Sequence, residues 1–95
     1  MDFKQIVKDV LLTEAKELEK AATNISFDIE KAIDLIINSK GNLIVTGVGK
    51  SGLVGAKIAA TLASTGTSSF FLHPTEAMHG DLGMISKGDI VLGIS

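Results

Sequence analysis

The sequence predicts an α/β fold in which helices alternate with the strands of a parallel sheet. Three apolar, strand-like runs, at 43–46, at 68–72 and from 90 onward, are separated by segments with helical periodicity. Continuous apolar strands with helices between them are typical of parallel sheets that are covered by helices on both faces. We therefore expect a three-layer α/β/α domain with the element order α-α-β-α-β-α-β.

Two helices are expected before the first strand, over about residues 2–40. In the first, from Phe3 to about Ala22, apolar residues recur at spacings of three and four, with Lys and Glu on the other face. Asn24 or Ser26 can cap the second helix, whose isoleucines form one stripe. Gly41 suits a left-handed C-cap at its end.

The first strand, Leu43–Thr46, leads into a glycine-rich turn and then into a helix from Ser51 to about Thr65. A Walker A motif would need a glycine where Ile44 stands, so that interpretation fails. The letters of a dinucleotide fingerprint are present as Gly47-x-Gly49-x-x-Gly52. However, the acidic residue expected at the end of the next strand is missing, which argues against NAD.

The strand at 68–72 is followed by a dense polar segment, His73-Pro74-Thr75-Glu76-Ala77-Met78-His79-Gly80-Asp81. A short helix is expected from Pro74 to His79, because proline is favoured at the first helical position. The two histidines and the carboxylates between and after them suit a metal site, direct substrate contact or a structural helix start, and spacing leaves these open.

The carboxyl ends of the strands are where α/β proteins bind ligands. The turn Gly47–Ser51, the segment His73–His79 and Ser95 all fall at those ends. Backbone amides at a helix N-terminus together with Lys50 favour an anion, above all a phosphate. Gly66-Thr67 lies at the opposite end of its strand, where geometry favours a helix C-cap and a structural role.

Composition limits the class of protein. The 95 residues allow one small domain, and a net charge of −2 offers no basic surface for nucleic acid. Cysteine is absent, which excludes disulfides and thiolate chemistry. With no secretory signal and no apolar run of membrane-spanning length, we expect a cytoplasmic protein with no membrane partner. Because the chain ends on a strand, we expect it to be the front part of a longer domain.

Three segments together resemble the sugar isomerase (SIS) domain of the arabinose 5-phosphate isomerase family. They are Gly47-Val48-Gly49-Lys50-Ser51-Gly52, Ala63-Ser64-Thr65-Gly66-Thr67 and Phe71-Leu72-His73-Pro74-Thr75-Glu76-Ala77-Met78-His79-Gly80-Asp81-Leu82-Gly83-Met84. The resemblance implies a Rossmann-like SIS fold whose N-terminal part fills residues 1–95, with helices over about 2–40 and a βαβαβ unit over about 43–95. The rest of the domain, and any CBS pair that follows it in the family, would lie beyond Ser95.

The resemblance also implies an aldose–ketose isomerase that interconverts D-ribulose 5-phosphate and D-arabinose 5-phosphate through an enediolate. In the family this reaction feeds 3-deoxy-D-manno-octulosonate biosynthesis for lipopolysaccharide and similar surface polysaccharides, in cytoplasmic tetramers. By position Lys50 matches a catalytically relevant lysine, and Gly66, Thr67, His73 and His79 match substrate-contacting residues. His73 also matches a residue that can bind zinc, which tends to inhibit, so no cofactor is required.

Further catalytic residues of the family lie beyond Ser95, so the resemblance predicts that these 95 residues alone do not catalyse turnover. An alternative function is a regulatory SIS module that binds a sugar phosphate without catalysis. A third is a truncated product that mainly oligomerises through its N-terminal helices. Lys50 and the two histidines favour the enzyme, because sensing needs no groups for proton transfer.

Overall fold

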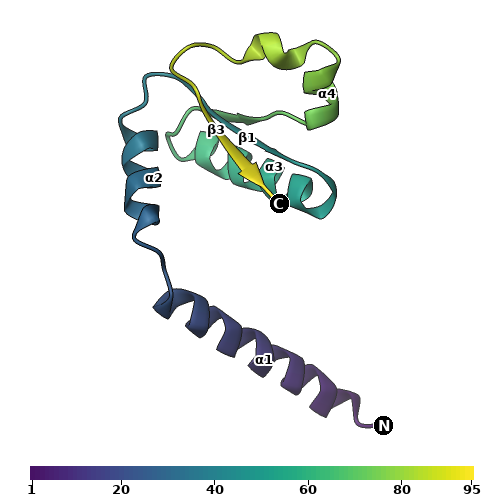
Figure 1. Cartoon of the computed structure of the whole chain (residues 1–95). Helices are drawn as coiled ribbons and strands as arrows, with labels where there is room; N and C mark the ends of the chain where they lie inside the picture. The colour runs from purple at the N-terminus through teal and green to yellow at the C-terminus, as the bar shows by residue number, and fades with distance from the viewer. The chain divides into compact units, whose positions relative to one another are not determined.

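The computed structural model describes the backbone of residues 1–95 and every side chain except that of Asp81. Its elements, in chain order, are α1 (Phe3–Thr23), α2 (Asp28–Ile37), β1 (Leu43–Gly47), α3 (Gly49–Ser64), β2 (Ser69–Phe71), α4 (Pro74–Met78), the 3₁₀ helix η1 (Asp81–Met84) and β3 (Ile90–Ile94) (Figure 1). The predicted order of helices and strands is confirmed, and η1 is the element that the sequence did not predict.

The chain divides into two compact units, residues 1–31 and 32–95. In the first unit, α1 begins with Asp2, whose carboxylate accepts the backbone N–H of Gln5 at 3.1 Å. Asn24 caps the end of α1, because its side-chain N–H donates to the Lys20 carbonyl at 2.8 Å. The residue that caps the start of α2 is therefore Ser26, whose hydroxyl accepts the Asp28 N–H at 3.1 Å.

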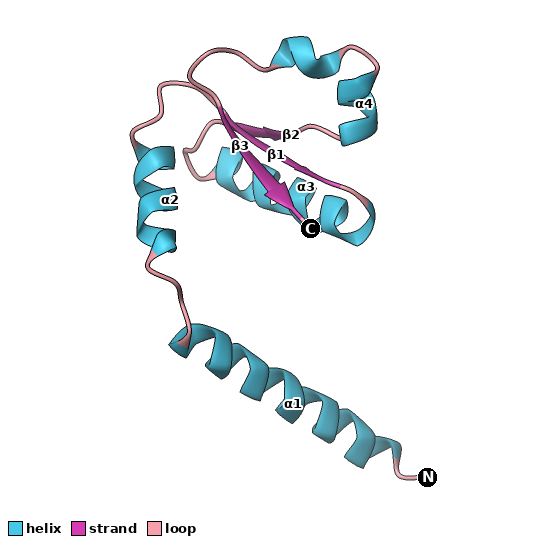
Figure 2. Cartoon of the chain, in the orientation of Figure 1, coloured by secondary structure: helices cyan, strands magenta, loops and turns pink.

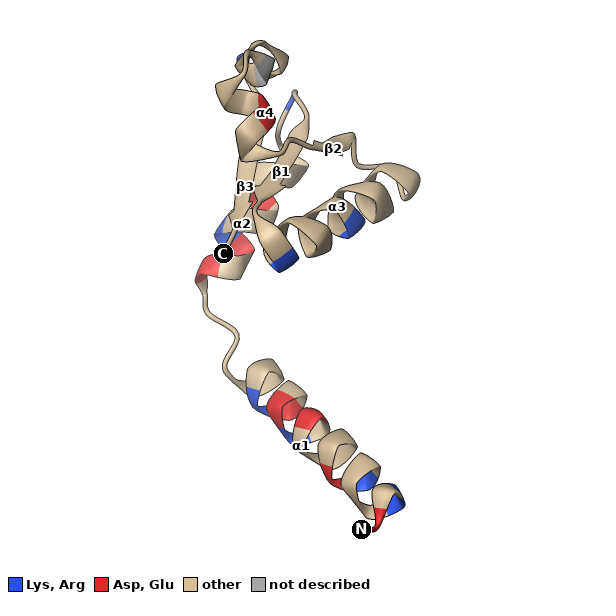
Figure 3. Ribbon diagram, turned by 90° about the vertical axis from the view of Figure 1, so that its right-hand side faces the viewer, with Lys and Arg blue, Asp and Glu red and all other residues tan. Residues whose placement is uncertain are grey.

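Helix α1 carries charges of both signs along its length (Figure 3) and buries none of its residues within the chain. Its apolar positions, including Phe3 at 72% exposure, are open as well. Among the described residues, no helix combines the length and the apolar character that crossing a membrane requires.

The second unit is built on a three-stranded parallel sheet in the order β2-β1-β3 (Figure 2). Leu43 of β1 is in register with Ser69 on one side and Ile90 on the other. The predicted parallel sheet is thereby confirmed, and β1 is its central strand. Parallel neighbours need a crossover, and α3 provides the one between β1 and β2.

Helix α3 covers one face of the sheet, and the core lies between them. Leu43, Val45 and Ala59 are buried there. The approach is close because α3 presents glycine to the sheet. A Cβ on Gly55 would lie 3.1 Å from Val45 Cγ1, and a Cβ on Gly52 would lie 2.8 Å from the Gly47 carbonyl oxygen.

The opposite face of the sheet is less evenly covered. Ile44 is fully buried, whereas Val91, its partner in register on β3, is 52% exposed. This face of the sheet is therefore covered at the central strand β1 and more open at the edge strand β3.

Helix α3 ends as the sequence predicts. Gly66 has a φ of +103°, and the Thr67 N–H donates to the Leu62 carbonyl at 2.9 Å. This is the 6→1 hydrogen bond of a Schellman motif, in which glycine takes the left-handed position without a Cβ penalty. The geometric prediction of a C-cap at Gly66-Thr67 is confirmed.

The predicted left-handed C-cap at Gly41 is wrong. Helix α2 already ends at Ile37, and the φ of Gly41 is not positive. Glycine is needed there for space, because a Cβ would lie 2.7 Å from both the Asp89 nitrogen and the Gly88 carbonyl carbon. The requirement comes from a segment almost fifty residues away, which local sequence cannot reveal.

At the amino edge of the sheet, Asp89 links the loop before β1 to the loop before β3 by hydrogen bonds. Its carboxylate accepts the Asn42 N–H and the Ser86 N–H, both at 2.7 Å. The Ser86 and Asn42 hydrogen bonds hold the pKa of this carboxyl below its usual value, against a smaller opposing effect of desolvation. The Ser39 hydroxyl adds a further link by donating to the Gly88 carbonyl at 2.9 Å.

Candidate functional site

The three strands end at one edge of the sheet, because they are parallel and in register. β1 ends at Gly47, β2 at Phe71 and β3 at Ile94. The Leu72 N–H donates to the Val45 carbonyl at 2.8 Å and extends the β1–β2 pairing by one step. The structure thus brings the turn after β1 and the start of the His73 segment to the same edge, as predicted.

The start of α3 has features that favour an anion. Its N-cap, Val48, has no side chain that can accept a hydrogen bond, and the first turn contains no acidic residue. The Gly52 N–H reaches the Val48 carbonyl, so the amides of residues 49–51 are those that lack a partner within the helix. Lys50 lies in this first turn and is exposed. A helix N-terminus with an added cation is a favourable place for phosphate or an oxyanion.

Gly49 makes this turn possible. Its φ is +60°, and a Cβ there would meet no atom within 4 Å. The requirement is therefore conformational and not steric, since side chains with a Cβ disfavour that region. Because α3 starts at Gly49, two residues earlier than predicted, Lys50 stands inside the helix and not before it.

His73 is held in place from two sides. It is the N-cap of α4, where its Nδ1 accepts the Thr75 N–H at 3.1 Å. The Phe71 ring packs against the imidazole edge-on, with ring centroids 6.3 Å apart and planes at 68°. That phenyl ring also reaches α3, because its Cζ lies 3.6 Å from where a Cβ on Gly52 would be. Phe71 therefore bridges His73 and the glycine turn that carries Lys50.

His79 follows α4 instead of lying on it. The helix has only five residues, so His73 and His79 flank its two ends as N-cap and C-cap. The predicted helix from Pro74 to His79 is present and ends one residue earlier, at Met78. Glu76 lies in the first turn of α4, a favourable place for a carboxylate. Asp81, the last residue of the predicted cluster, has a side chain outside the described part of the structure.

A zinc site at His73 is not assembled by the side chains that the structure describes. Among them, no three His, Asp or Glu side chains lie close enough to hold one ion. Nδ1 of His73 is already engaged by Thr75. The imidazole could offer a metal only Nε2, so zinc binding at His73 stays a prediction from the resemblance.

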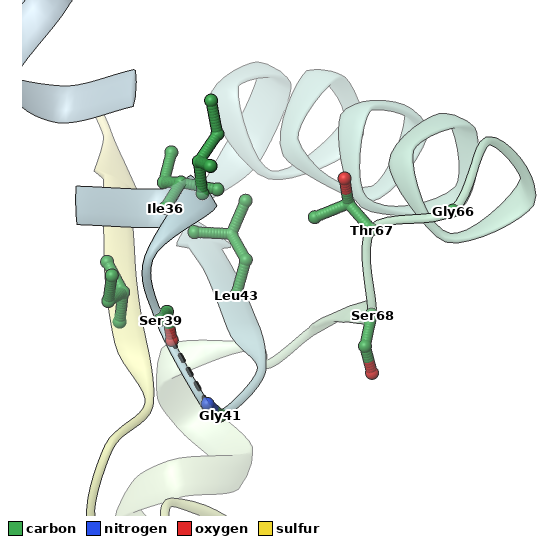
Figure 4. Close-up of a pocket in the computed structure, with 9 residues that line it drawn as sticks. Ile36, Ser39, Gly41, Leu43, Gly66, Thr67 and Ser68 are labelled. Atoms are coloured by element: carbon green, nitrogen blue, oxygen red, sulfur yellow. Dashed lines mark hydrogen bonds between the residues drawn. The ribbon is translucent and has the colours of Figure 1, made fainter. Parts of the chain in front are cut away.

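Gly66 and Thr67 lie at the opposite, amino edge of the sheet. With Ser39, Gly41 and Leu43 among others they line a pocket of about 390 Å³ (Figure 4). Strand β1 separates this pocket from the turn that carries Lys50, and five residues of strand span about 16 Å. Within one chain the structure does not bring Gly66 and Thr67 together with Lys50 and His73. Their predicted role in substrate contact stays a prediction.

Two contributors to the site were missed by the sequence analysis. Phe71 was assigned only to a strand, and Thr75 was given no role. A signal for Thr75 existed: a proline at the first helical position makes the preceding residue the N-cap, and an N-cap side chain accepts an N–H from two or three residues on. The His73-Pro74-Thr75 order therefore predicts the observed contact.

Comparison with known proteins identifies the family to which this fold belongs. The family model described as "SIS domain" matches residues 35–95. The chain is 50% identical over its full length to the arabinose 5-phosphate isomerase KdsD of Pseudomonas aeruginosa and 52% identical to the KdsD of Yersinia pestis. It spans 29% of the length of each of these relatives.

Solved structures agree with the fold. The c3406 protein of Escherichia coli CFT073, solved in complex with arabinose 5-phosphate, superposes with a TM-score of 0.92 at 42% identity. The match covers 99% of this chain and 50% of that one. The glycine turn, the parallel sheet and the matched residues 35–95 lead to one assignment. The chain belongs to the SIS domain family.

Proposed function

We propose that this chain supplies the first part of the active site of an aldose–ketose isomerase that interconverts D-ribulose 5-phosphate and D-arabinose 5-phosphate. One observation supports the proposal most directly: two groups lie at the same edge of the sheet. One is the start of α3, which has no side-chain cap and contains Lys50. The other is the imidazole of His73, which is positioned by Thr75 and Phe71. The names of the relatives, and the sugar-phosphate complex of the structural neighbour, support the choice of substrate.

The reaction makes modest demands on the protein. A base removes a proton from C1 of the ketose, and the C2 carbonyl oxygen gains negative charge and then a proton, which gives the enediol. A proton is then returned to C2, and the O1 hydroxyl loses its proton as O1 becomes the carbonyl oxygen. No electrons leave the substrate, so no redox cofactor is required. The difficult species is the enediolate, which nearby cations and hydrogen-bond donors stabilise.

The described residues suit that task. Lys50, in the first turn of α3, places a cation where an oxyanion or the phosphate would bind. For His73 and His79, which flank α4, we infer contacts with sugar hydroxyls or with the developing oxyanion. We assign Lys50 the catalytic role and the two histidines the role of substrate binding.

The experiment is an isomerase assay with ribulose 5-phosphate on the longest polypeptide that the gene encodes. Lys50→Ala is expected to lower kcat by about 10²-fold or more, the typical cost of removing one group that stabilises an oxyanion. Lys57→Ala is the matched control, since Lys57 is an exposed lysine of the same helix, about two turns further on. Its activity should equal that of the unmodified protein.

Two other results would change the assignment. Sugar-phosphate binding without turnover would indicate a sensor that keeps the pocket of an isomerase. Turnover that Lys50→Ala and Lys57→Ala lower equally would remove Lys50 from the site.

We also propose, from the family resemblance, a cytoplasmic homotetramer that serves 3-deoxy-D-manno-octulosonate biosynthesis. In such an assembly Gly66 and Thr67 would contact substrate held by another copy, since they lie at the far edge of their own sheet. Coexpressed Lys50→Ala and Thr67→Val chains should then recover part of the activity that each loses alone. If Thr67→Val is fully active by itself, the hydroxyl has no part in the site.

A further inference from the structure

The backbone conformation of His73 restricts the position of its imidazole. Pro74 occupies the first helical position of α4, and a residue before proline is driven out of the helical region into extended backbone. His73 has φ −71° and ψ 133°, in agreement. Its side chain is thereby directed back over the first turn, where an N-cap side chain meets the free amides of the helix.

The contact with Thr75 identifies which ring nitrogen carries the proton. A backbone N–H can only donate, so the Nδ1 atom that it reaches at 3.1 Å must present a lone pair. In a neutral imidazole one nitrogen accepts and the other bears the hydrogen. With Nδ1 as the acceptor, the hydrogen is on Nε2.

The other contacts of the ring leave Nε2 available. Phe71 packs against the imidazole in a T-shaped arrangement, and its phenyl ring contains no nitrogen or oxygen that could accept the Nε2 hydrogen. His73 is half-buried, and no hydrogen bond to Nε2 is formed by any side chain or backbone group in the described part of the chain. His73 follows β2 as Lys50 follows β1, so the two residues come from the same edge of the sheet.

From this we infer that His73 meets the substrate as a neutral imidazole that donates its Nε2–H to a substrate oxygen, and that the backbone N–H of Thr75 is the positioning group that holds this tautomer. The inference rests on the proposed function and deepens it. A donor beside Lys50 would stabilise the enediolate oxygen, whereas a proton-abstracting role at Nε2 would require the other tautomer and the loss of the Thr75 contact.

The test is a two-bond ¹H–¹⁵N correlation spectrum of the histidine rings, which distinguishes protonated from unprotonated ring nitrogens. The spectrum is recorded on the longest polypeptide that the gene encodes, and the ring resonances that disappear in His73→Gln are those of His73. It is recorded at an alkaline pH at which the spectra themselves show neutral rings in both the folded and the unfolded chain. Folded His73 should be in the Nε2–H form alone, while the same chain unfolded in urea shows the mixture of tautomers found in solution.

Two variants separate positioning from simple stability. In an ester variant, oxygen replaces the N–H of Thr75 and the side chain is kept; Thr75→Ala keeps the N–H and is the control. The ester should shift His73 toward the unfolded mixture and lower kcat about fivefold, the effect of one net hydrogen bond. Thr75→Ala should match the unmodified protein in the ring spectrum, because it keeps the N–H.

Each outcome bears on a different proposal. A ring hydrogen on Nδ1, or the same mixture in folded and unfolded chains, overturns the tautomer inference whatever the enzyme does. An Nε2–H ring in a protein without isomerase turnover upholds the tautomer and overturns the proposed function. An ester variant that changes the spectrum but leaves kcat unchanged overturns the positioning role of Thr75.

Discussion

The close approach of α3 to the end of β1 makes Gly52 one of the most demanding positions in the chain. In Gly52→Ala the new Cβ would lie 2.8 Å from the Gly47 carbonyl oxygen, a distance that real Cβ atoms do not tolerate. The obstacle is backbone within the sheet, so helix and strand must separate. Overpacking costs about 1–3 kcal/mol, and we take the upper end because a main-chain atom is hit. Alanine recovers about 1 kcal/mol of helix propensity, which leaves about 2 kcal/mol of net destabilisation.

Gly55→Ala, in the same helix, is expected to change the free energy of unfolding much less than Gly52→Ala does. There the Cβ would meet side-chain atoms, Val45 Cγ1 at 3.1 Å and Phe71 Cε1 at 3.2 Å, which can give by a few tenths of an ångström. A cost of about 1 kcal/mol is then balanced by the same gain in propensity, so the free energy of unfolding should hardly change. Gly83→Ala, with no atom within 4 Å of the new Cβ, is the control for adding a methyl group.

The assay is thermal or urea unfolding followed by circular dichroism. For a domain of this size 1 kcal/mol corresponds to about 4–8 °C in Tm, so Gly52→Ala should melt roughly 8–16 °C lower. Gly55→Ala and Gly83→Ala should stay within a few degrees of the unmodified protein. A Gly52→Ala variant as stable as Gly55→Ala would refute the reasoning, since it would mean that α3 does not sit as close to the strand as the structure places it.

Two further predictions concern the amino edge of the sheet. Gly66→Ala, at a φ of +103°, should lose about 1–3 kcal/mol in urea unfolding through strain, and a result within error of zero would mean that the C-cap is not left-handed. For Asp89 the folded-state pKa is lowered, so its contribution to stability is present above the usual value of 3.8 and is lost as the pH falls through the folded-state pKa. Asp89→Asn should therefore unfold more easily than the unmodified protein at neutral pH, and the difference should shrink as the pH falls below 3.8. A difference that is constant across that range would show that the carboxylate charge has no part in joining the two loops.

Much of the fold could be predicted because its signals are local. Periodicity located α1, glycine and β-branched residues located β1, and Pro74 located the start of α4. The parallel sheet followed from the alternation of helices and apolar strands. Boundaries were less accurate where one residue type can serve two purposes, as at Gly49, which is both the turn and the first residue of α3.

What could not be predicted depends on contacts between distant segments. Gly41 looks like a C-cap, and only the position of Asp89 shows that it is a glycine for lack of space. For the site, the topology placed Lys50 and His73 at one edge. By contrast, the ring of Phe71 that links them is a packing detail, and strand alternation alone does not tell which face it occupies.

The central position of β1 has a consequence for local unfolding. Its backbone is hydrogen-bonded to β2 on one side and to β3 on the other, and its Ile44 and Val45 are fully buried. Amide hydrogens there can exchange with solvent only when the whole sheet opens, so their exchange rate reports the global free energy of unfolding. The amides of α1, a helix with no buried residue, can exchange by fraying turn by turn. One deuterium-exchange experiment would thus measure the stability of the sheet and that of the first helix separately, within a single chain.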